Sequence, residues 1–461
     1  MKLTLHTVQI CALIGLALLG NKSSADARPA LQPAWARLTL PNGMTAWHRQ
    51  LPAARTISIR VCVPSAAGLQ PSAPANDRLL FSLLGTAGEE YPRTRLDRIR
   101  DEGALEITGT SGQVFSSLSV SAIANRAQEA AKILASLLYK PARDGQLFAE
   151  LRTRAVNELR WRNGNAWSAL DPQLMQRIYG GQVEGQFYGL SDSALAATRL
   201  EDVLEHHRKI LALAETFLVS CGPLSAREMQ AILAQNFTRP RLGPEPYRPL
   251  REPFPAATNA VHLFPHQAAS SVWVKGVSAA PRPGSPDYPA FVLTARIWSE
   301  MLMDSVRSRA GLVYSIWASS PSRQRHASAE FVLYRCQDVP RAITLAEESL
   351  RALRAGTAVL PTPDGQVRQQ SIDDVLPAMK NQLLASIALQ NITPAERTAS
   401  FAAWLLASGS AAAFDILPEA IRSVTADAIR QTARRYFQAM HWGVALSPAA
   451  ASNAPALRWN P

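Results

Sequence analysis

The chain has 461 residues, of which 47 % are hydrophobic and 18 % charged, a composition that is typical of globular proteins and excludes an intrinsically disordered one. Its formal net charge of +12 comes from basic residues spread along the chain. This even distribution does not form the basic stripe that is typical of nucleic-acid-binding proteins, although the positive charge is compatible with an acidic partner.

Residues 1–27 have the pattern of a secretory signal peptide. Lys2 precedes the apolar core "ICALIGLALLG", and "ADA", which ends at Ala27, offers small residues for cleavage. An N-terminal anchor helix is the alternative, but the apolar core is short for one, and Cys11 lacks the small preceding residues of a lipoprotein site. No later run is long and apolar enough to span a bilayer. We therefore expect an exported, periplasmic protein with no stable membrane insertion.

The first half, residues 28–237, shows helix and strand patterns in mixed order. The predicted elements are helices at Asn76–Leu84 and Pro92–Glu102, strands at Leu105–Thr108 and Phe115–Ile123, and a helix at Ala127–Tyr139. Gly103 is placed to end the second helix. Alternate residues from Leu118 to Ala122 are apolar, as in a strand with one buried face. The half closes with "DVLEHHRKILALAETFLVS", which predicts a helix leading into a short strand.

A proline-rich stretch, residues 238–260, follows and predicts an extended linker, because proline fixes φ and removes a hydrogen-bond donor. The second half, residues 261–448, is followed by a tail at 449–461. Its predicted elements are a helix that ends at Arg309, strands in "GLVYSIWAS" and "ASAEFVLYRC", and a helix in "RAITLAEESLRAL". "DAIRQTARRYFQAMHWGVA" again predicts a helix leading into a strand.

The two halves resemble each other in sequence as well as in plan. "SIRVCVPSAAGLQPSAPANDRLL" and "SVWVKGVSAAPRPGSPDYPAFVL" both read as a strand, a Ser-Ala-Ala segment, a proline-containing loop and an apolar helix. A duplicated module predicts two homologous domains. Because strands and helices are mixed without strict βαβ alternation, we predict an α+β fold. In each domain a mostly antiparallel or mixed sheet would carry helices packed on one face.

Cysteine and histidine residues do not form a recognisable metal or redox motif. Cys62, Cys221 and Cys336 lie in strand-like runs at wide spacings, which favours buried free thiols and leaves one disulfide open. In "EHHRK", His206 is expected in solvent and His207 at the edge of the apolar helix face. His262 and His266 are separated by "LFP", and proline excludes a helix interior there.

Motifs in order over about 35–448 resemble those of the pitrilysin/insulinase metallopeptidases, an inverzincin family that includes the mitochondrial processing peptidases. The most specific motif is Arg307-Ser308-Arg309-Ala310-Gly311-Leu312-Val313-Tyr314, which is similar to the family's second-half signature R-E-x-x-G-L-x-Y. "MQRIYGGQVEGQFYGL" and "VTADAIRQTARRYF" resemble its mid-domain segment and closing helix. The resemblance implies two insulinase-like domains that form half of a clamshell.

The family's zinc motif, His-x-x-Glu-His on a helix before a Gly-Thr pair, is absent from this chain. Aligned on the Gly-Thr pair, its three roles fall on Asn76, Leu79 and Leu80. An amide is a poor zinc ligand, and leucine neither binds a metal nor accepts a proton. Glu158 falls roughly where the family keeps a carboxylate ligand, but it reads better as a solvated helix residue. We therefore expect neither a metal nor a catalytic residue that acts in isolation in this chain.

In two-subunit members of the family, one chain carries the zinc motif and the other supplies an Arg/Tyr pair. This chain is similar to the second type. The resemblance implies that Arg307 and Tyr314 bind substrate and donate to the scissile carbonyl in the transition state. Two features depart from the family pattern: "ARIWSEMLMDSV" lacks the usual Gly-Gly pair, and Ser308 replaces the usual Glu. Without the resemblance, a helix stop at Gly311 and a favourable charge at the helix end would explain the stretch.

The sequence therefore predicts a zinc-free subunit of a heterodimeric insulinase-like peptidase. Its partners would be a zinc-bearing insulinase-like subunit, which holds the only expected cofactor, and an extended peptide substrate. The alternative is a catalytically inert binding or scaffold protein with the same fold, as occurs in respiratory complexes. The two hypotheses differ in whether Arg307 and Tyr314 face a chamber closed by a partner. An active hydrolase with its own site has no supporting motif, since G-x-S-x-G, P-loop and G-x-G-x-x-G patterns are all missing.

Overall fold

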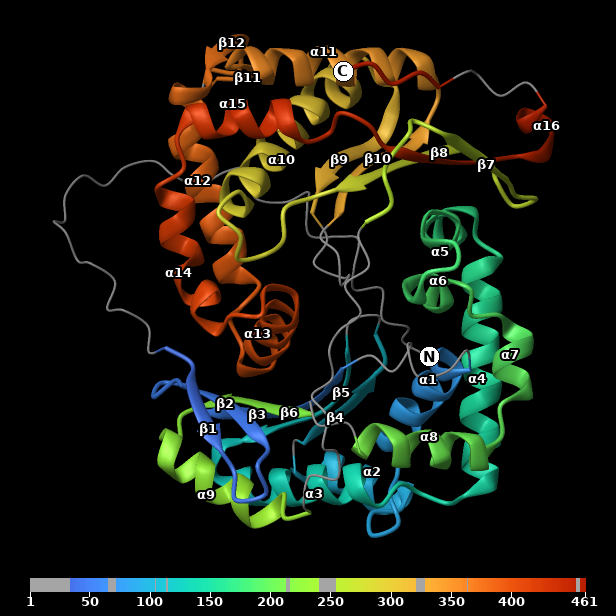
Figure 1. Cartoon of the computed structure of the whole chain (residues 1–461), viewed down its shortest axis with the longest axis vertical. Helices are drawn as coiled ribbons and strands as arrows, with labels where there is room; N and C mark the ends of the chain where they lie inside the picture. The colour runs from blue at the N-terminus through green and yellow to red at the C-terminus, as the bar shows by residue number, and fades with distance from the viewer. Residues whose placement is uncertain are drawn as a thin grey trace, which may run out of the picture. The chain divides into compact units, whose positions relative to one another are not determined.

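The computed structural model describes residues 34–64, 72–103, 105–112, 115–212, 216–239, 254–320, 328–362, 364–452 and 457–461. The predicted signal peptide and most of the predicted linker lie outside these residues. The chain from Ala34 to Pro461 forms one unit with two large sheets and a small hairpin (Figure 1).

The first sheet has six strands in the order β1-β2-β6-β3-β5-β4. They are β1 (Ala36–Thr39), β2 (Thr45–Gln50), β3 (Thr56–Pro64), β4 (Glu106–Thr110), β5 (Phe115–Ile123) and β6 (Phe217–Gly222). The β2–β6 pair is parallel and every other pair is antiparallel. The apolar face predicted for β5 is confirmed, because Leu118 and Val120 lie opposite Val61 and Ile59 and all four are fully buried. The expectation of a single buried face is wrong, because the alternate residues Ser117 and Ser119 are buried as well.

The second sheet has five strands in the order β7-β13-β8-β10-β9. They are β7 (Val261–Pro265), β8 (Val272–Ala279), β9 (Val313–Ser319), β10 (Ser328–Cys336) and β13 (His441–Leu446). Its β7–β13 pair is parallel and the others are antiparallel. Apart from β1, the first sheet has the same order and the same strand directions. The predicted α+β fold of two homologous halves with mixed sheets is therefore confirmed.

Helices cover one face of each sheet. On the first sheet they include α1 (Ala73–Leu84) and α3 (Ala127–Tyr139). On the second they include α10 (Tyr288–Leu302), α11 (Val339–Ala355) and α15 (Ala426–Arg435), which Figure 1 shows gathered on one side of β8 and β10. The predicted bounds of α3 are correct. Helix α1 begins earlier than predicted because Pro74 is accommodated in its first turn.

The remaining elements connect these layers. They are α2 (Arg93–Gly103), η2 (Ala124–Arg126), α4 (Gly145–Asn163), α5 (Ala166–Tyr179), α6 (Val183–Tyr188), α7 (Asp192–Ala197), α8 (Leu200–Ala212), α9 (Ala226–Asn236), the π-helical turn η3 (Met303–Arg309), β11 (Thr357–Pro361), β12 (Val367–Ser371), α12 (Ile372–Leu389), α13 (Pro394–Ser408), α14 (Ala411–Arg422) and α16 (Pro448–Ala451).

A helix from the opposite half covers the second face of each sheet. Helix α13 packs on β3 and β6, and its Phe401 joins a buried cluster with Phe217. Helix α5 packs on β8 and β13, where Gly443 leaves room for it: a Cβ there would lie 3.0 Å from Leu174 Cδ2. Each half thus completes the burial of the other half's sheet, and this exchange joins both halves into one unit.

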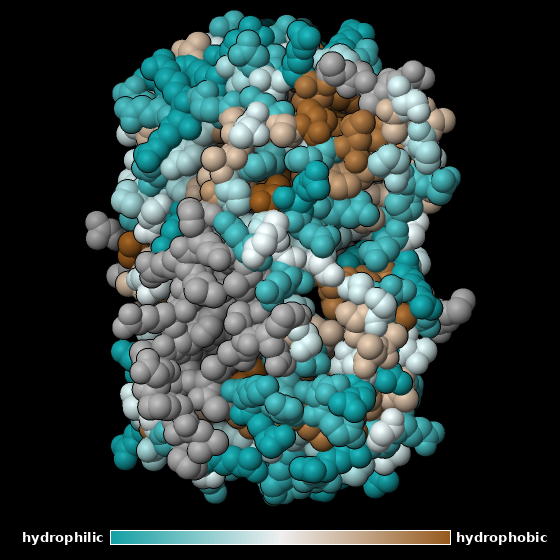
Figure 2. Space-filling view, turned by 45° about the vertical axis from the view of Figure 1, so that its right-hand side comes forward, coloured by the Kyte–Doolittle hydropathy of each residue, from teal (hydrophilic) through white to brown (hydrophobic). Residues whose placement is uncertain are grey.

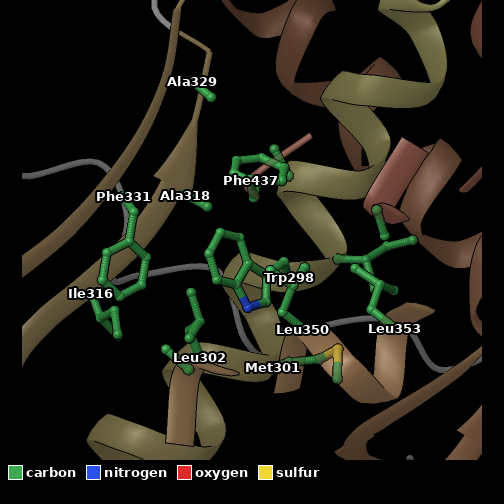
Figure 3. Packing of buried hydrophobic residues seen from close by; sticks show 14 of the residues in the cluster. Trp298, Met301, Leu302, Ile316, Ala318, Ala329, Phe331, Leu350, Leu353 and Phe437 are labelled. Atoms are coloured by element: carbon green, nitrogen blue, oxygen red, sulfur yellow. The ribbon is translucent and has the colours of Figure 1, made fainter. Parts of the chain in front are cut away.

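Trp298 on α10 anchors the helix that leads to the signature stretch. Its ring lies 5.3 Å from the ring of Phe331 on β10 and 4.9 Å from that of Phe437. Its Nε1 donates to Ser349 Oγ at 2.9 Å, so the one polar atom of the indole is satisfied. Figure 3 shows this ring among the aliphatic and aromatic side chains of the second core. The position of α10 relative to β9 and β10 is therefore set by close packing.

Within the described residues, no single helix is long and apolar enough to cross a membrane. Helices α13 and α14 are long and apolar enough only when they are counted as one segment, and the chain bends by 98° between them. On the face shown in Figure 2, hydrophilic residues predominate and apolar ones gather in separate patches.

Candidate functional site

The three positions aligned with the zinc motif lie in the buried part of α1. Asn76 is 2 % exposed, and Leu79 and Leu80 are 0 % exposed and belong to the first core. These residues do not fit a zinc ion, because two of the three side chains carry no donor atom. In the part of the chain that the structure describes, no group of three or more His, Cys, Asp or Glu residues is placed to hold a metal.

Glu158 on α4 is paired with an arginine that the sequence reasoning missed. Its Oε2 accepts from Arg78 Nη2 at 2.9 Å, and its side chain is 58 % exposed, which agrees with a solvated helix residue. Arg78 comes from α1, between the aligned metal positions. A guanidinium therefore supplies the positive charge opposite Glu158, and such an exposed pair stabilises the fold by at most about 1 kcal/mol.

A buried polar cluster lies beside these positions. Ser116 Oγ on β5 donates to Asp77 Oδ2, and His206 Nε2 on α8 lies 3.3 Å from Asp77 Oδ1. All three side chains are nearly or fully buried. Because Asp77 bonds directly to Ser116 and no histidine stands between them, the cluster is not a nucleophile–base–acid relay. Its hydrogen bonds connect α1 to both β5 and α8.

The predicted solvent position of His206 is wrong. The residue is fully buried because α8 packs against α1, and this contact covers a side of α8 beyond its apolar face. His207 is also buried and donates through Nε2 to the Leu138 carbonyl at 2.7 Å. Burial lowers the pKa of His207, and the bond to the Leu138 carbonyl only partly offsets this effect.

We predict that the purified chain binds no stoichiometric zinc and hydrolyses no peptide alone, because its aligned metal positions hold an amide and two leucines. Metal analysis of chain purified without chelator, together with a peptidase assay, checks this. One tightly held zinc per chain that disappears in a Glu158→Gln variant would contradict it, and Glu150→Gln on the same helix is the matched control.

The three described cysteines are free and buried, as predicted. Burial raises the pKa of the Cys62 and Cys336 thiols to about 12 and that of Cys221 to about 11. At neutral pH these thiols are protonated and are not nucleophiles, so they provide no alternative catalytic group.

The signature stretch ends α10 in a π-helical turn. Within η3, Ser308 Oγ donates to the Met303 carbonyl at 3.0 Å, and Arg309 Nε donates to Asp304 Oδ2 at 2.8 Å. Gly311 has a φ of +65°, and its N–H donates to the Arg307 carbonyl at 3.0 Å. The left-handed glycine stops the helix and turns the chain into β9, as the sequence suggests. The wider π turn was not predicted, and such turns are frequent at functional sites.

This turn brings Arg307 and Tyr314 together. The Arg307 guanidinium carbon lies 6.0 Å from the centre of the Tyr314 ring, within the range of a cation–π contact. The Tyr314 residue is 65 % exposed, and Arg307 is also exposed. Both donors therefore point to where a bound molecule can reach them. The missing Gly-Gly pair and the Ser308 substitution do not separate the two side chains.

Three solved structures with similar folds are distant from this chain in sequence. The M16 peptidase inactive domain of Pseudomonas fluorescens matches with a TM-score of 0.75 at 14 % identity, over 93 % of this chain and 100 % of that one. A protease from Helicobacter pylori matches with a TM-score of 0.74 at 12 % identity, over 90 % of this chain and 100 % of that one.

The periplasmic protease PqqL of Escherichia coli matches with a TM-score of 0.71 at 16 % identity. The match covers 95 % of this chain but 49 % of PqqL, so the chain spans about half of that protein's length. No protein-family model and no curated protein matches the sequence. The structural matches show that the chain has the insulinase-like fold of M16 peptidase domains.

Proposed function

From this fold and the absent zinc ligands, we propose that the chain is the zinc-free subunit of a heterodimeric insulinase-like peptidase. The observation that carries the proposal is the exposed Arg307–Tyr314 pair, which stands in a chain whose aligned metal positions are buried and hold one amide and two side chains without a donor atom. A subunit that complements a zinc-bearing partner needs donors for the substrate carbonyl and does not need a hydrolytic group of its own.

In the proposed mechanism, the partner subunit would hold the zinc ion, which would supply an activated water when bound. The Tyr314 hydroxyl and the Arg307 guanidinium of this chain donate to the scissile carbonyl oxygen, on which negative charge develops in the transition state. One preorganised donor of this kind typically contributes about 3–4 kcal/mol to transition-state stabilisation. The planar guanidinium also fits a peptide carbonyl or carboxylate better than an ammonium group would.

The substrate would be a peptide in extended conformation. Tyr314 lies on β9, an edge strand of the second sheet, so the free edge of β9 can pair with a peptide backbone while the Tyr314 side chain reaches it. Backbone pairing gives little sequence selectivity, which would instead come from side chains beside the edge.

The length of PqqL favours a partner for this chain. A single PqqL chain is about twice as long as the part matched here, so this chain would form one half of a clamshell and a zinc-bearing sister would form the other. The test is to co-express this chain with a zinc-bearing insulinase-like protein from the same cell. Co-purification and a peptidase activity that neither chain shows alone are expected. Independent migration of the two chains and no gain in activity would overturn the proposal.

Export is predicted to remove about the first 27 residues. The short apolar core followed by "ADA" motivates this, and the neighbour PqqL is a periplasmic protease. Intact-mass measurement of the protein recovered from the periplasmic fraction should find a chain that begins near Arg28. An uncleaved N-terminus in the cytosolic fraction would contradict both the cleavage and the location.

The second candidate function is an inert binding or scaffold protein, and the match to a domain described as inactive favours it. On this hypothesis the chain also forms complexes, but Tyr314 and Arg307 have no role in turnover. The two functions are therefore separated by the effect of Tyr314 variants and not by association alone.

A further inference from the structure

Arg335 has a backbone conformation that is unusual for a side chain of its type. Its φ is +55°, and it lies where the register of β10 against β8 shifts between Leu333 and Cys336. A non-glycine residue in the left-handed region costs of order 1 kcal/mol or more, and such strain clusters at functional sites. A bulge of this kind re-aims the side chain that it carries.

The side chain of Arg335 is aimed at Tyr314. Its guanidinium carbon lies 6.0 Å from the centre of the Tyr314 ring and 5.8 Å from that of Tyr334. The two tyrosine rings are 6.1 Å apart. Since Arg307 also lies 6.0 Å from the Tyr314 ring, two guanidinium groups from different elements meet at one exposed phenol.

Neither of these two guanidinium groups is neutralised by the described residues. Arg307 and Arg335 are both exposed, and neither makes an ion pair with any residue in the described ranges. Their neighbour Arg309, in contrast, pairs with Asp304 at 2.8 Å. Two unpaired cations beside one exposed ring give this place a positive potential, which favours an anionic ligand.

We propose that Arg335, placed beside Arg307 and Tyr314, forms a subsite for a carboxylate-bearing side chain of an extended peptide. A carboxylate fits because it accepts two parallel hydrogen bonds from the Arg335 guanidinium, which leaves the Tyr314 hydroxyl available for the scissile carbonyl. A peptide is the favoured carrier because β9, which bears Tyr314, is an edge strand of the sheet. Only the identity of the ligand as a peptide rests on the proposed function.

The test measures peptide binding to this chain alone by fluorescence anisotropy. The probes are a short labelled peptide with one central glutamate and an analogue with glutamine in its place. At low ionic strength the glutamate peptide should bind about five- to tenfold more tightly, and added salt should reduce this preference. Arg335→Asn should abolish most of the preference and change binding of the glutamine peptide much less, because asparagine tolerates positive φ but removes the guanidinium that would pair with a carboxylate. Arg335→Lys should retain part of it.

The matched control is Arg368→Asn, which removes an exposed arginine of β12 that already pairs with Asp364 at 2.8 Å. Equal affinities for the two peptides, no measurable binding of either, or an equal loss in Arg368→Asn would each overturn the subsite. These results are independent of heterodimer turnover, which tests the proposed function. A peptidase that depends on Tyr314 but ignores peptide charge would leave the proposed function intact and remove only the subsite.

Discussion

Tyr314→Phe is expected to lower turnover by the proposed heterodimer about 100- to 1,000-fold. The substitution removes one hydroxyl from a side chain that is 65 % exposed and keeps the ring that contacts Arg307 and Arg335. The cost in stability should therefore be small, and association with the partner should be unchanged. If the hydroxyl acts chiefly in the transition state, the loss appears mostly in kcat and little in KM. Steady-state kinetics on the co-purified complex measures both.

Arg307 variants separate a role in chemistry from a role in helix stability. Arg307→Ala should also lower activity, but it alters the last turn before Gly311. Arg307→Lys keeps the positive charge at the helix end and loses the planar fork, so it should lower activity with little effect on stability.

Full activity of a well-folded Tyr314→Phe heterodimer would exclude a role for the hydroxyl and favour the scaffold function.

Trp298→Ala is expected to reduce the free energy of unfolding by about 3–5 kcal/mol. The indole is fully buried and stacks on Phe331, so its removal leaves a cavity between α10 and the second sheet. It also leaves the Ser349 hydroxyl without its indole partner. Denaturant unfolding of the unchanged chain and of the Trp298→Ala variant, followed by far-UV circular dichroism, gives the midpoint and the slope from which each free energy of unfolding is obtained.

The matched control is Trp298→Phe, which keeps most of the apolar contact and loses the hydrogen bond. It should cost clearly less than the alanine substitution. An effect of Trp298→Ala below about 1 kcal/mol would show that this core is not close-packed around the indole. Because α10 leads directly into η3, which carries Arg307, and packs on β9, which carries Tyr314, we also expect Trp298→Ala to lower activity of the proposed heterodimer at temperatures where the chain is still folded.

Local signals in the sequence predicted much of the fold. The period of apolar residues locates β5 and α3, and the repeated strand, loop and helix order predicts two homologous α+β halves. Gly311 was identified as a helix stop because its effect depends on its own φ and on the bonds of the preceding turn. The poor fit of Asn76, Leu79 and Leu80 to a zinc ion is likewise a property of residue identity alone.

Residues far apart in the chain decided what the sequence left open. His206 was misplaced because a helical pattern shows one apolar face, whereas burial of the opposite side depends on α1, and its partner Asp77 is 129 residues away. The exchange of α5 and α13 between the two sheets, the pairing of Glu158 with Arg78, and the bulge that aims Arg335 at Tyr314 also require contacts between separate elements. The sequence by itself determined which residues are available for a carbonyl clamp and which are missing for a metal. Only the tertiary structure decided that Arg307 lies beside Tyr314 and that Arg335 joins them, because strand register and helix packing set the distances between these side chains.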